Sequence, residues 1–135
     1  MTAIADTAGP LGAASAVALK SIPVSFAYAS SVTLDVLASN MFAMSNAMAG
    51  NMAVTLNNGV KGLSGVIAVL QDATGGRTLS FVTPGWTQMM DAKITSFIDT
   101  NFTAPSLPSL VAYDFETIAG SNFVFFSIFS AKLLA

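Results

Sequence analysis

The chain has 135 residues, enough for one domain whose folding buries roughly two-thirds of the surface exposed by the unfolded chain. It contains neither cysteine nor histidine, which excludes disulfides, thiolate metal sites, zinc hydrolase chemistry and Ser-His-Asp catalysis. Its net charge of −2 and its widely spaced basic residues provide no basic patch, so we expect no nucleic-acid partner.

Charged residues are scarce throughout the chain. They make up 9% of the sequence against 53% hydrophobic residues, whereas about a quarter of the residues in an ordinary soluble domain are charged. A spanning helix would need ~18 uninterrupted apolar residues, and the apolar stretches are broken by Lys20, Pro23, Asp35, Asn40, Asn46 and Asn51. We therefore expect no membrane partner, and expect much of the surface to be buried against other chains.

Residues 1–30 differ in composition from the rest of the chain. Residues 11–20 are rich in alanine and fit a short helix that ends before Pro23. The segment is either a frayed terminal arm or an arm that docks on a neighbouring molecule. Docking is favoured by isolated large apolar residues, which would give the arm something to bury: Ile4, Leu11, Val17 and Leu19. We predict an attachment arm over 1–30 and one domain over 31–135.

From residue 31 onward, short apolar segments alternate with turn residues, as strands do in an all-β domain. Strands are predicted at 32–37, 41–48, 52–56, 63–71, 77–82, 110–118 and 123–131. Residues 93–98 fit either a further strand or a turn or two of helix, and 88–108 as a whole stays open between helix, strand and loop. The predicted fold is an antiparallel β-sandwich of jelly-roll type with an extended N-terminal arm.

Methionine is concentrated between residues 41 and 52, where its flexible side chain suits an adaptable packing surface. We predict that Met41 and Met44 lie in an interface with another chain.

The segment 71–78 (Gln-Asp-Ala-Thr-Gly-Gly-Arg-Thr) separates two predicted strands and predicts a β-hairpin. Asp72 can accept hydrogen bonds from the backbone just after it, and Gly75 and Gly76 can take the positive φ that a tight loop requires.

The order of these segments resembles a module of tailed-bacteriophage fibre and decoration proteins, over residues 40–128. The shared features are an apolar strand, Gln-Asp-x-Thr-Gly-Gly-Arg-Thr, an alternating strand and then Trp86, followed by an Asp-containing strand at 113–118 and an aromatic strand at 123–128. The longer insert at 88–108 departs from the module. The resemblance implies a trimer with a structural role in the virion.

The last predicted strand is apolar on both faces. Phe123, Phe125 and Phe129 alternate with a second set, formed by Val124, Phe126 and Ile128. A sandwich covers only one face of a strand, so either the N-terminal segment of the same chain or another subunit covers the second. We predict that Val124, Phe126 and Ile128 form part of an oligomer or virion interface.

The remaining polar and aromatic candidates favour structural roles over chemistry. Asp114 and Glu116 share a strand face, as paired carboxylates of a glycosidase do, but no third partner accompanies them. Asp91 and Asp99 are loop acids that could join a hard-cation site, and solvated acids are the commoner case. Trp86 could stack on a sugar, although a tryptophan after a hairpin more often closes the end of a sandwich.

We therefore expect a protein of the phage virion that is not an enzyme and has no cofactor, metal ligand or catalytic residue. It would be a capsid decoration, head-fibre or spike-like protein that self-associates, as a trimer by the resemblance, and docks on other virion proteins such as the major capsid protein. One alternative is a carbohydrate-binding module of a tail fibre or tail tip, with Trp86 as the stacking residue. Another is a non-viral surface protein that assembles with itself.

Overall fold

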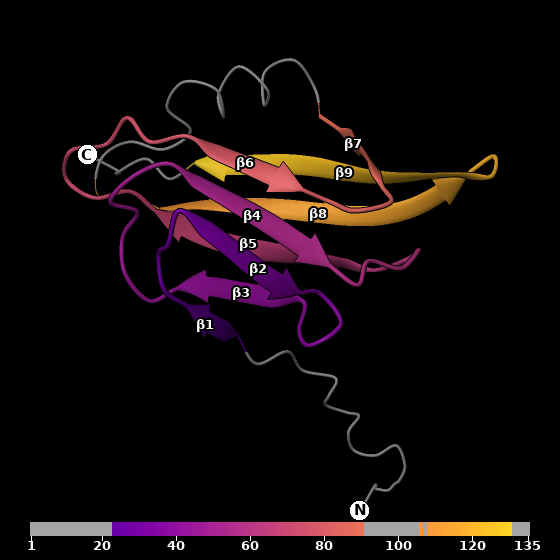
Figure 1. Ribbon diagram of the computed structural model, residues 1–135, viewed down its shortest axis with the longest axis horizontal. Helices are drawn as coiled ribbons and strands as arrows, with labels where there is room; N and C mark the ends of the chain where they lie inside the picture. The colour runs from indigo at the N-terminus through magenta and orange to yellow at the C-terminus, as the bar shows by residue number, and fades with distance from the viewer. Residues whose placement is uncertain (1–22, 91–105, 107, 131–135) are drawn as a thin grey trace, which may run out of the picture.

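The computed structural model describes residues 23–90, 106 and 108–130 (Figure 1). Within these ranges the protein is all-β, which confirms the predicted class, with two sheets and no helix. The large sheet has the strand order β1-β3-β5-β8-β9-β7, and the small sheet has the order β2-β4-β6. The strands are β1 (Val24–Phe26), β2 (Ser31–Asp35), β3 (Met41–Met44), β4 (Met52–Asn57), β5 (Ser64–Leu70), β6 (Leu79–Val82), β7 (Thr87–Met89), β8 (Pro108–Ile118) and β9 (Ser121–Ser130).

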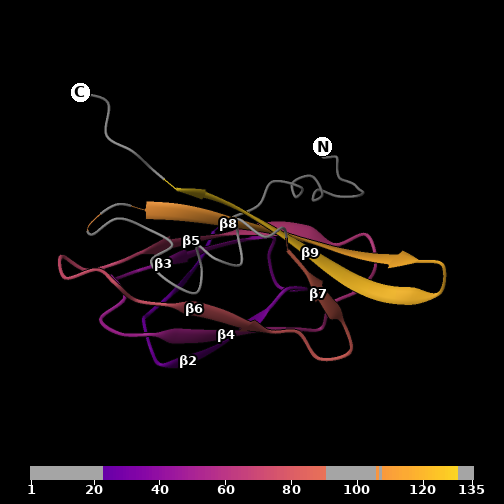
Figure 2. The same ribbon diagram turned by 90° about the horizontal axis from the view of Figure 1, so that it is seen from above.

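The first six strands wind back and forth between the two sheets. β1, β3 and β5 pair in parallel in the large sheet, and β2, β4 and β6 pair in parallel in the small sheet. Each connection therefore crosses from one sheet to the other, as in a β-solenoid. Figure 2 shows the resulting layers, with β2, β4 and β6 on one side and β3, β5 and β8 on the other.

A long antiparallel hairpin, β8–β9, interrupts this winding. After β6 the chain returns to the large sheet as β7, where a further turn of the solenoid would pair it with β5. Instead β8 pairs antiparallel with β5 and β9 pairs parallel with β7, so the hairpin lies between them. Its turn is formed by Ala119 and Gly120, which both have positive φ (52° and 81°), as a two-residue hairpin requires.

The predicted antiparallel pairing is wrong for most of the structure. Only β5–β8 and β8–β9 are antiparallel, and the other five strand pairs of the described residues are parallel. The jelly-roll order is not confirmed. The reason lies in the connections: turn residues that suit a hairpin, such as those of 71–78, here carry the chain across to the opposite sheet.

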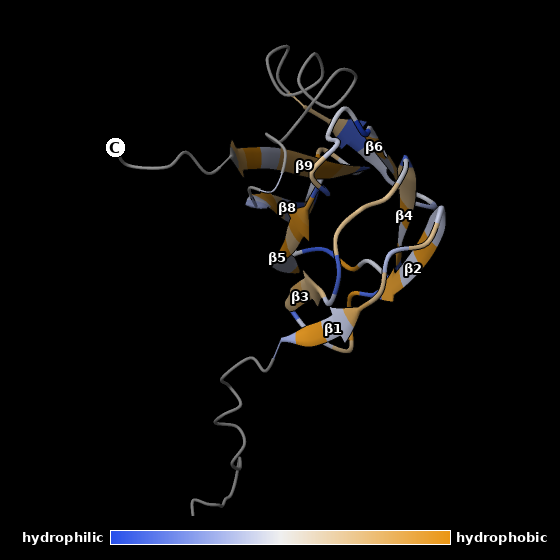
Figure 3. Ribbon diagram, turned by 90° about the vertical axis from the view of Figure 1, so that its left-hand side faces the viewer, coloured by the Kyte–Doolittle hydropathy of each residue, from blue (hydrophilic) through white to orange (hydrophobic). Residues whose placement is uncertain are grey.

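One hydrophobic core lies between the two sheets, which face each other across it in Figure 3. Alternation along β4 places Met52, Val54 and Leu56 in the core, each at most 2% exposed. The large sheet contributes Phe42, Ile67, Val69, Val111, Tyr113, Phe115, Val124 and Phe126. Phe81 of β6 stacks on Phe126 of β9, with ring centroids 4.4 Å apart. No helix long and apolar enough to span a membrane occurs in the described part of the chain.

The sheet begins inside the segment predicted as an arm. β1 lies within 1–30 and pairs with β3 in the register Val24↔Phe42. Residues 1–22 and 93–98 lie outside the described residues, so the attachment arm and the open assignment of 93–98 stay predictions. β7 is a strand that the sequence analysis did not predict.

Candidate interaction surface

The hairpin β8–β9 presents one face to the core and the other to solvent. On the core side Val111, Phe115 and Val124 are fully buried. On the opposite side, which we call the outer face of the large sheet, Leu110 is 45% and Phe129 is 65% exposed. Six of the large apolar side chains that are exposed in the described residues therefore lie on this face. Besides Leu110 and Phe129, they are Met41, Met89, Ile118 and Phe125.

The predicted interface set on β9 is wrong in its choice of face. Val124 and Phe126 are 0% and 5% exposed and belong to the core of their own chain, and Ile128 is half-buried against that core. The small sheet packs on this side of the strand, so no partner is needed to cover it. Phe123, Phe125 and Phe129 occupy the outer face instead.

A signal for the correct face was present in the sequence. The tight turn at 119–120 fixes the register of the hairpin, with Ile118 opposite Ser121. That register places Phe123 opposite Glu116 and Phe125 opposite Asp114. Because carboxylates stay in contact with water unless they are paired, the acids mark their side of the hairpin as the outer face.

A hollow lies on the outer face where the side chains are small. Its residues include Val66 of β5, Ala112 of β8 and Ser127 of β9, which occupy one row across the sheet. The next row contributes Asp114 and Phe125. The hollow has a volume of about 650 Å³ and is open to solvent.

Beneath this hollow, the absence of a side chain at Gly65 lets Tyr113 and the backbone of Asn40 pack closely. A Cβ at position 65 would collide with the Tyr113 hydroxyl and would lie 2.6 Å from the Asn40 carbonyl oxygen. Tyr113 is 2% exposed, and its hydroxyl has no hydrogen-bond partner among the described residues. Burial raises the pKa of Tyr113 to about 12, so the hydroxyl stays protonated and adds no charge to the sheet.

The two carboxyls of the outer face lie side by side. The hydrogen bond with Asp114, and then the repulsion of its charge, raise the pKa of Glu116 above its ordinary value. In the described part of the chain, their cross-strand partners on β9 are Phe123 and Phe125, which are apolar.

The two methionines predicted as interface residues differ in position. Met41 is 38% exposed and belongs to the outer face, next to Val66 in the same row. Met44 is half-buried and packs against the core. The predicted arm residues lie outside the described part of the chain, so their role stays a prediction; they are Ile4, Leu11, Val17 and Leu19.

The loop 71–78 is not a hairpin, because it joins β5 of the large sheet to β6 of the small sheet. Its predicted turn chemistry is confirmed: Asp72 Oδ1 accepts hydrogen bonds from the backbone nitrogens of Thr74 (3.1 Å) and Gly75 (3.2 Å), and Gly75 and Gly76 have φ of 70° and 73°.

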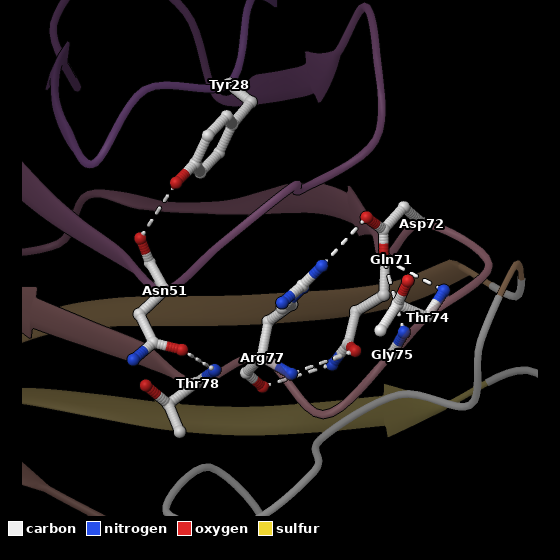
Figure 4. A network of polar contacts seen from close by, with 8 residues as sticks. All are labelled: Tyr28, Asn51, Gln71, Asp72, Thr74, Gly75, Arg77 and Thr78. Atoms are coloured by element: carbon white, nitrogen blue, oxygen red, sulfur yellow. Dashed lines mark hydrogen bonds and ion pairs between the residues drawn. The ribbon is translucent and has the colours of Figure 1, made fainter.

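Side chains close this loop from within (Figure 4). Gln71 is fully buried, and its side-chain amide both donates to the Arg77 carbonyl oxygen and accepts from the Arg77 backbone nitrogen, each at 3.1 Å. The Arg77 guanidinium lies 2.9 Å from the Asp72 carboxylate and holds the pKa of that carboxyl below its ordinary value. These contacts fix the conformation of the loop.

Trp86 packs on the body of the protein. Its ring meets that of Phe115 edge to face, with centroids 5.0 Å apart, and the residue is half-buried against the core. Its backbone nitrogen donates to the Thr83 carbonyl oxygen at 3.0 Å. These contacts agree with the expectation that the tryptophan closes the end of the sandwich.

Among the described residues no group of three or more acids could hold a metal ion; Asp91 and Asp99 lie outside them. Comparison with known proteins gives no relative: no protein-family model, curated protein or solved structure matches the chain.

Proposed function

We propose that the protein is a non-enzymatic structural protein that works by associating with copies of itself. The observation that carries the proposal is the outer face of the large sheet, where Phe125 and Phe129 are 37% and 65% exposed beside Leu110. Several exposed large apolar side chains on one face are typical of interaction sites, because leaving them in water is unfavourable.

The scarcity of charge supports the same proposal. A free protein keeps itself soluble with charged side chains on its surface, and only 9% of this sequence is charged. On the outer face the acids Asp114 and Glu116 are the charged residues of β8 and β9, and they border the aromatic side chains instead of interrupting them. Burial of this face against another copy removes the apolar surface from water.

The assembly that we propose is the virion of a tailed bacteriophage, in which the protein is a capsid decoration, head-fibre or spike-like component. This setting rests on the sequence resemblance of residues 40–128, and the trimer rests on it as well. The jelly-roll topology belongs to the same resemblance. We further propose that residues 1–22 attach the protein to other virion proteins, such as the major capsid protein.

A carbohydrate-binding module remains the alternative, but the contact of Trp86 with Phe115 does not favour it. A stacking platform for a sugar needs an open ring face, and the residue is half-buried against the core.

Incorporation into particles tests the proposed function. Phage particles would be produced with the full chain, with Phe129→Ser, with a deletion of residues 1–22, and with Val82→Ser as the matched control on the small sheet, where Val82 is 48% exposed. Gold-labelled antibody in electron micrographs should mark particles carrying the full chain and the control, and only background levels should remain for the deletion. Absence of the full chain from purified particles would contradict a virion role.

A further inference from the structure

The outer face of β8–β9 carries a protrusion and the hollow in adjacent rows. Leu110 and Phe129 lie opposite each other and are 45% and 65% exposed; we call this pair the protrusion. The next row of the same face holds Ala112 opposite Ser127, at the hollow. Successive rows on one face are about 7 Å apart, because a strand rises about 3.4 Å per residue.

The hollow has room for the protrusion of another molecule. Its volume is about 650 Å³, whereas an apolar cavity of about 150 Å³ is enough to bind a benzene ring. Met41, Val66 and Phe125 supply apolar walls for an inserted ring. A protrusion and a matching hollow on one face make that face complementary to itself.

We propose that two copies of the chain pack outer face to outer face about a two-fold axis that runs across the strands between these two rows. The inference rests on the self-association proposed above, and it replaces the trimer that the resemblance implies with a two-fold dimer. Rotation about this axis places Phe129 of each copy over Ser127 of the other, and Leu110 over Ala112. The protrusion of each copy then occupies the hollow of the other copy, as an isologous contact requires.

The positions of the acids fit this axis. Asp114 lies one row beyond the hollow and Glu116 two rows beyond it, both on the side away from the protrusion. The Asp114 carboxylates of the two copies are therefore about 20 Å apart along the strands. That separation exceeds the Debye length of about 8 Å at physiological salt, so the like charges repel each other little.

The exposed area reaches the minimum expected of a specific dimer interface. A Phe side chain presents about 200 Å², so the exposed fractions of Phe125 and Phe129 together amount to about one whole ring. Met41, Met89 and Leu110 are each about 40% exposed and add a similar area. With the polar rim, two copies would bury on the order of 1,000 Å², about the smallest total expected of a specific interface.

Two complementary variants test the geometry. Ser127→Phe fills the hollow, and Phe129→Ala removes the protrusion; both positions are exposed, so neither change disturbs the core. The dimer of each variant alone should have a dissociation constant at least tenfold higher than that of the unchanged chain. A mixture should form dimers containing one chain of each kind, because the filled hollow then faces the missing protrusion. Native mass spectrometry separates these species by mass, and circular dichroism checks that each variant folds.

The outcomes separate the geometry from the proposed function. Recovery of mixed dimers supports the two-fold contact, with Val82→Ala as a control that should dimerise like the unchanged chain. A trimeric unchanged chain, or variants that fail to recover on mixing, overturns the two-fold contact and leaves self-association standing. An unchanged chain that is monomeric at every concentration overturns both.

Discussion

At the scale of single residues, Gln71 acts as a substitute for backbone pairing. Its amide binds both the nitrogen and the carbonyl oxygen of Arg77, as an opposite residue of a strand would. The loop between them is thereby closed although its ends enter different sheets. The turn-forming roles of Asp72 and the glycines could be predicted from the sequence, because they depend on local chemistry. The role of Gln71 could not, because a buried amide is recognised only from the fold around it.

Gly76 provides a direct test of the loop geometry. Its φ is 73°, and a Cβ added there would meet no atom within 4 Å. Gly76→Val should therefore destabilise the protein by about 1 kcal/mol or more through backbone strain alone. Gly76→Asn, which tolerates the left-handed region, should be milder. Urea denaturation measures both, and equal stability of the Val variant and the native chain would rule out this geometry.

The ion pair of Asp72 with Arg77 predicts a pH dependence of stability. The hydrogen bond with Arg77 lowers the pKa of Asp72 in the folded state. The contribution of the carboxylate is therefore fully present above the pKa of the unfolded chain and is lost as the pH falls through the folded pKa.

Asp72→Asn keeps an oxygen for the Thr74 and Gly75 nitrogens but removes the charge. The variant should be less stable than the native chain at pH 7, and the difference should shrink toward pH 3. Denaturation followed by circular dichroism at both values measures it. A difference that is the same at pH 3 and pH 7 would assign the effect to something other than the charge.

At the scale of elements, seven of the nine strands of the described residues were predicted, all but β1 and β7, but their partners were not. The sequence predicted a strand at 123–129 with apolar side chains on both faces. Which face is the core depends on where the small sheet lies, and this follows from the parallel winding of β2, β4 and β6. A short connection rich in turn residues has the same local sequence whether the strands that it joins pair with each other or enter different sheets. Residues 71–78 were therefore predicted to form a hairpin.

A pair of β9 variants tests the corrected assignment of faces. Phe126→Ala should lower the free energy of unfolding by about 3–5 kcal/mol, because Phe126 is 5% exposed and stacks on Phe81. Phe129→Ala should leave the stability of the isolated subunit nearly unchanged, since Phe129 is 65% exposed. Calorimetry at low protein concentration compares them. A larger loss of unfolding free energy for Phe129→Ala than for Phe126→Ala would show that the face carrying Phe129 is the core face.

At the scale of the whole molecule, the two outer faces differ in character. The small sheet presents short polar side chains, such as Ser31, Thr33 and Ser80, all exposed. The large sheet presents Leu110, Phe125 and Phe129. The low charge of the chain is therefore compatible with a soluble assembly in which the apolar faces are turned inward and the hydroxyl-bearing faces outward.

Sedimentation equilibrium of the full chain over a dilution series tests self-association through the outer face of the large sheet most directly. The mass should exceed that of one chain at high concentration and fall toward it on dilution. Phe129→Ser should shift this transition to at least tenfold higher concentration, while Val82→Ser should leave it in place. A native chain with the mass of one subunit at every concentration, or equal effects of the two substitutions, would contradict the account.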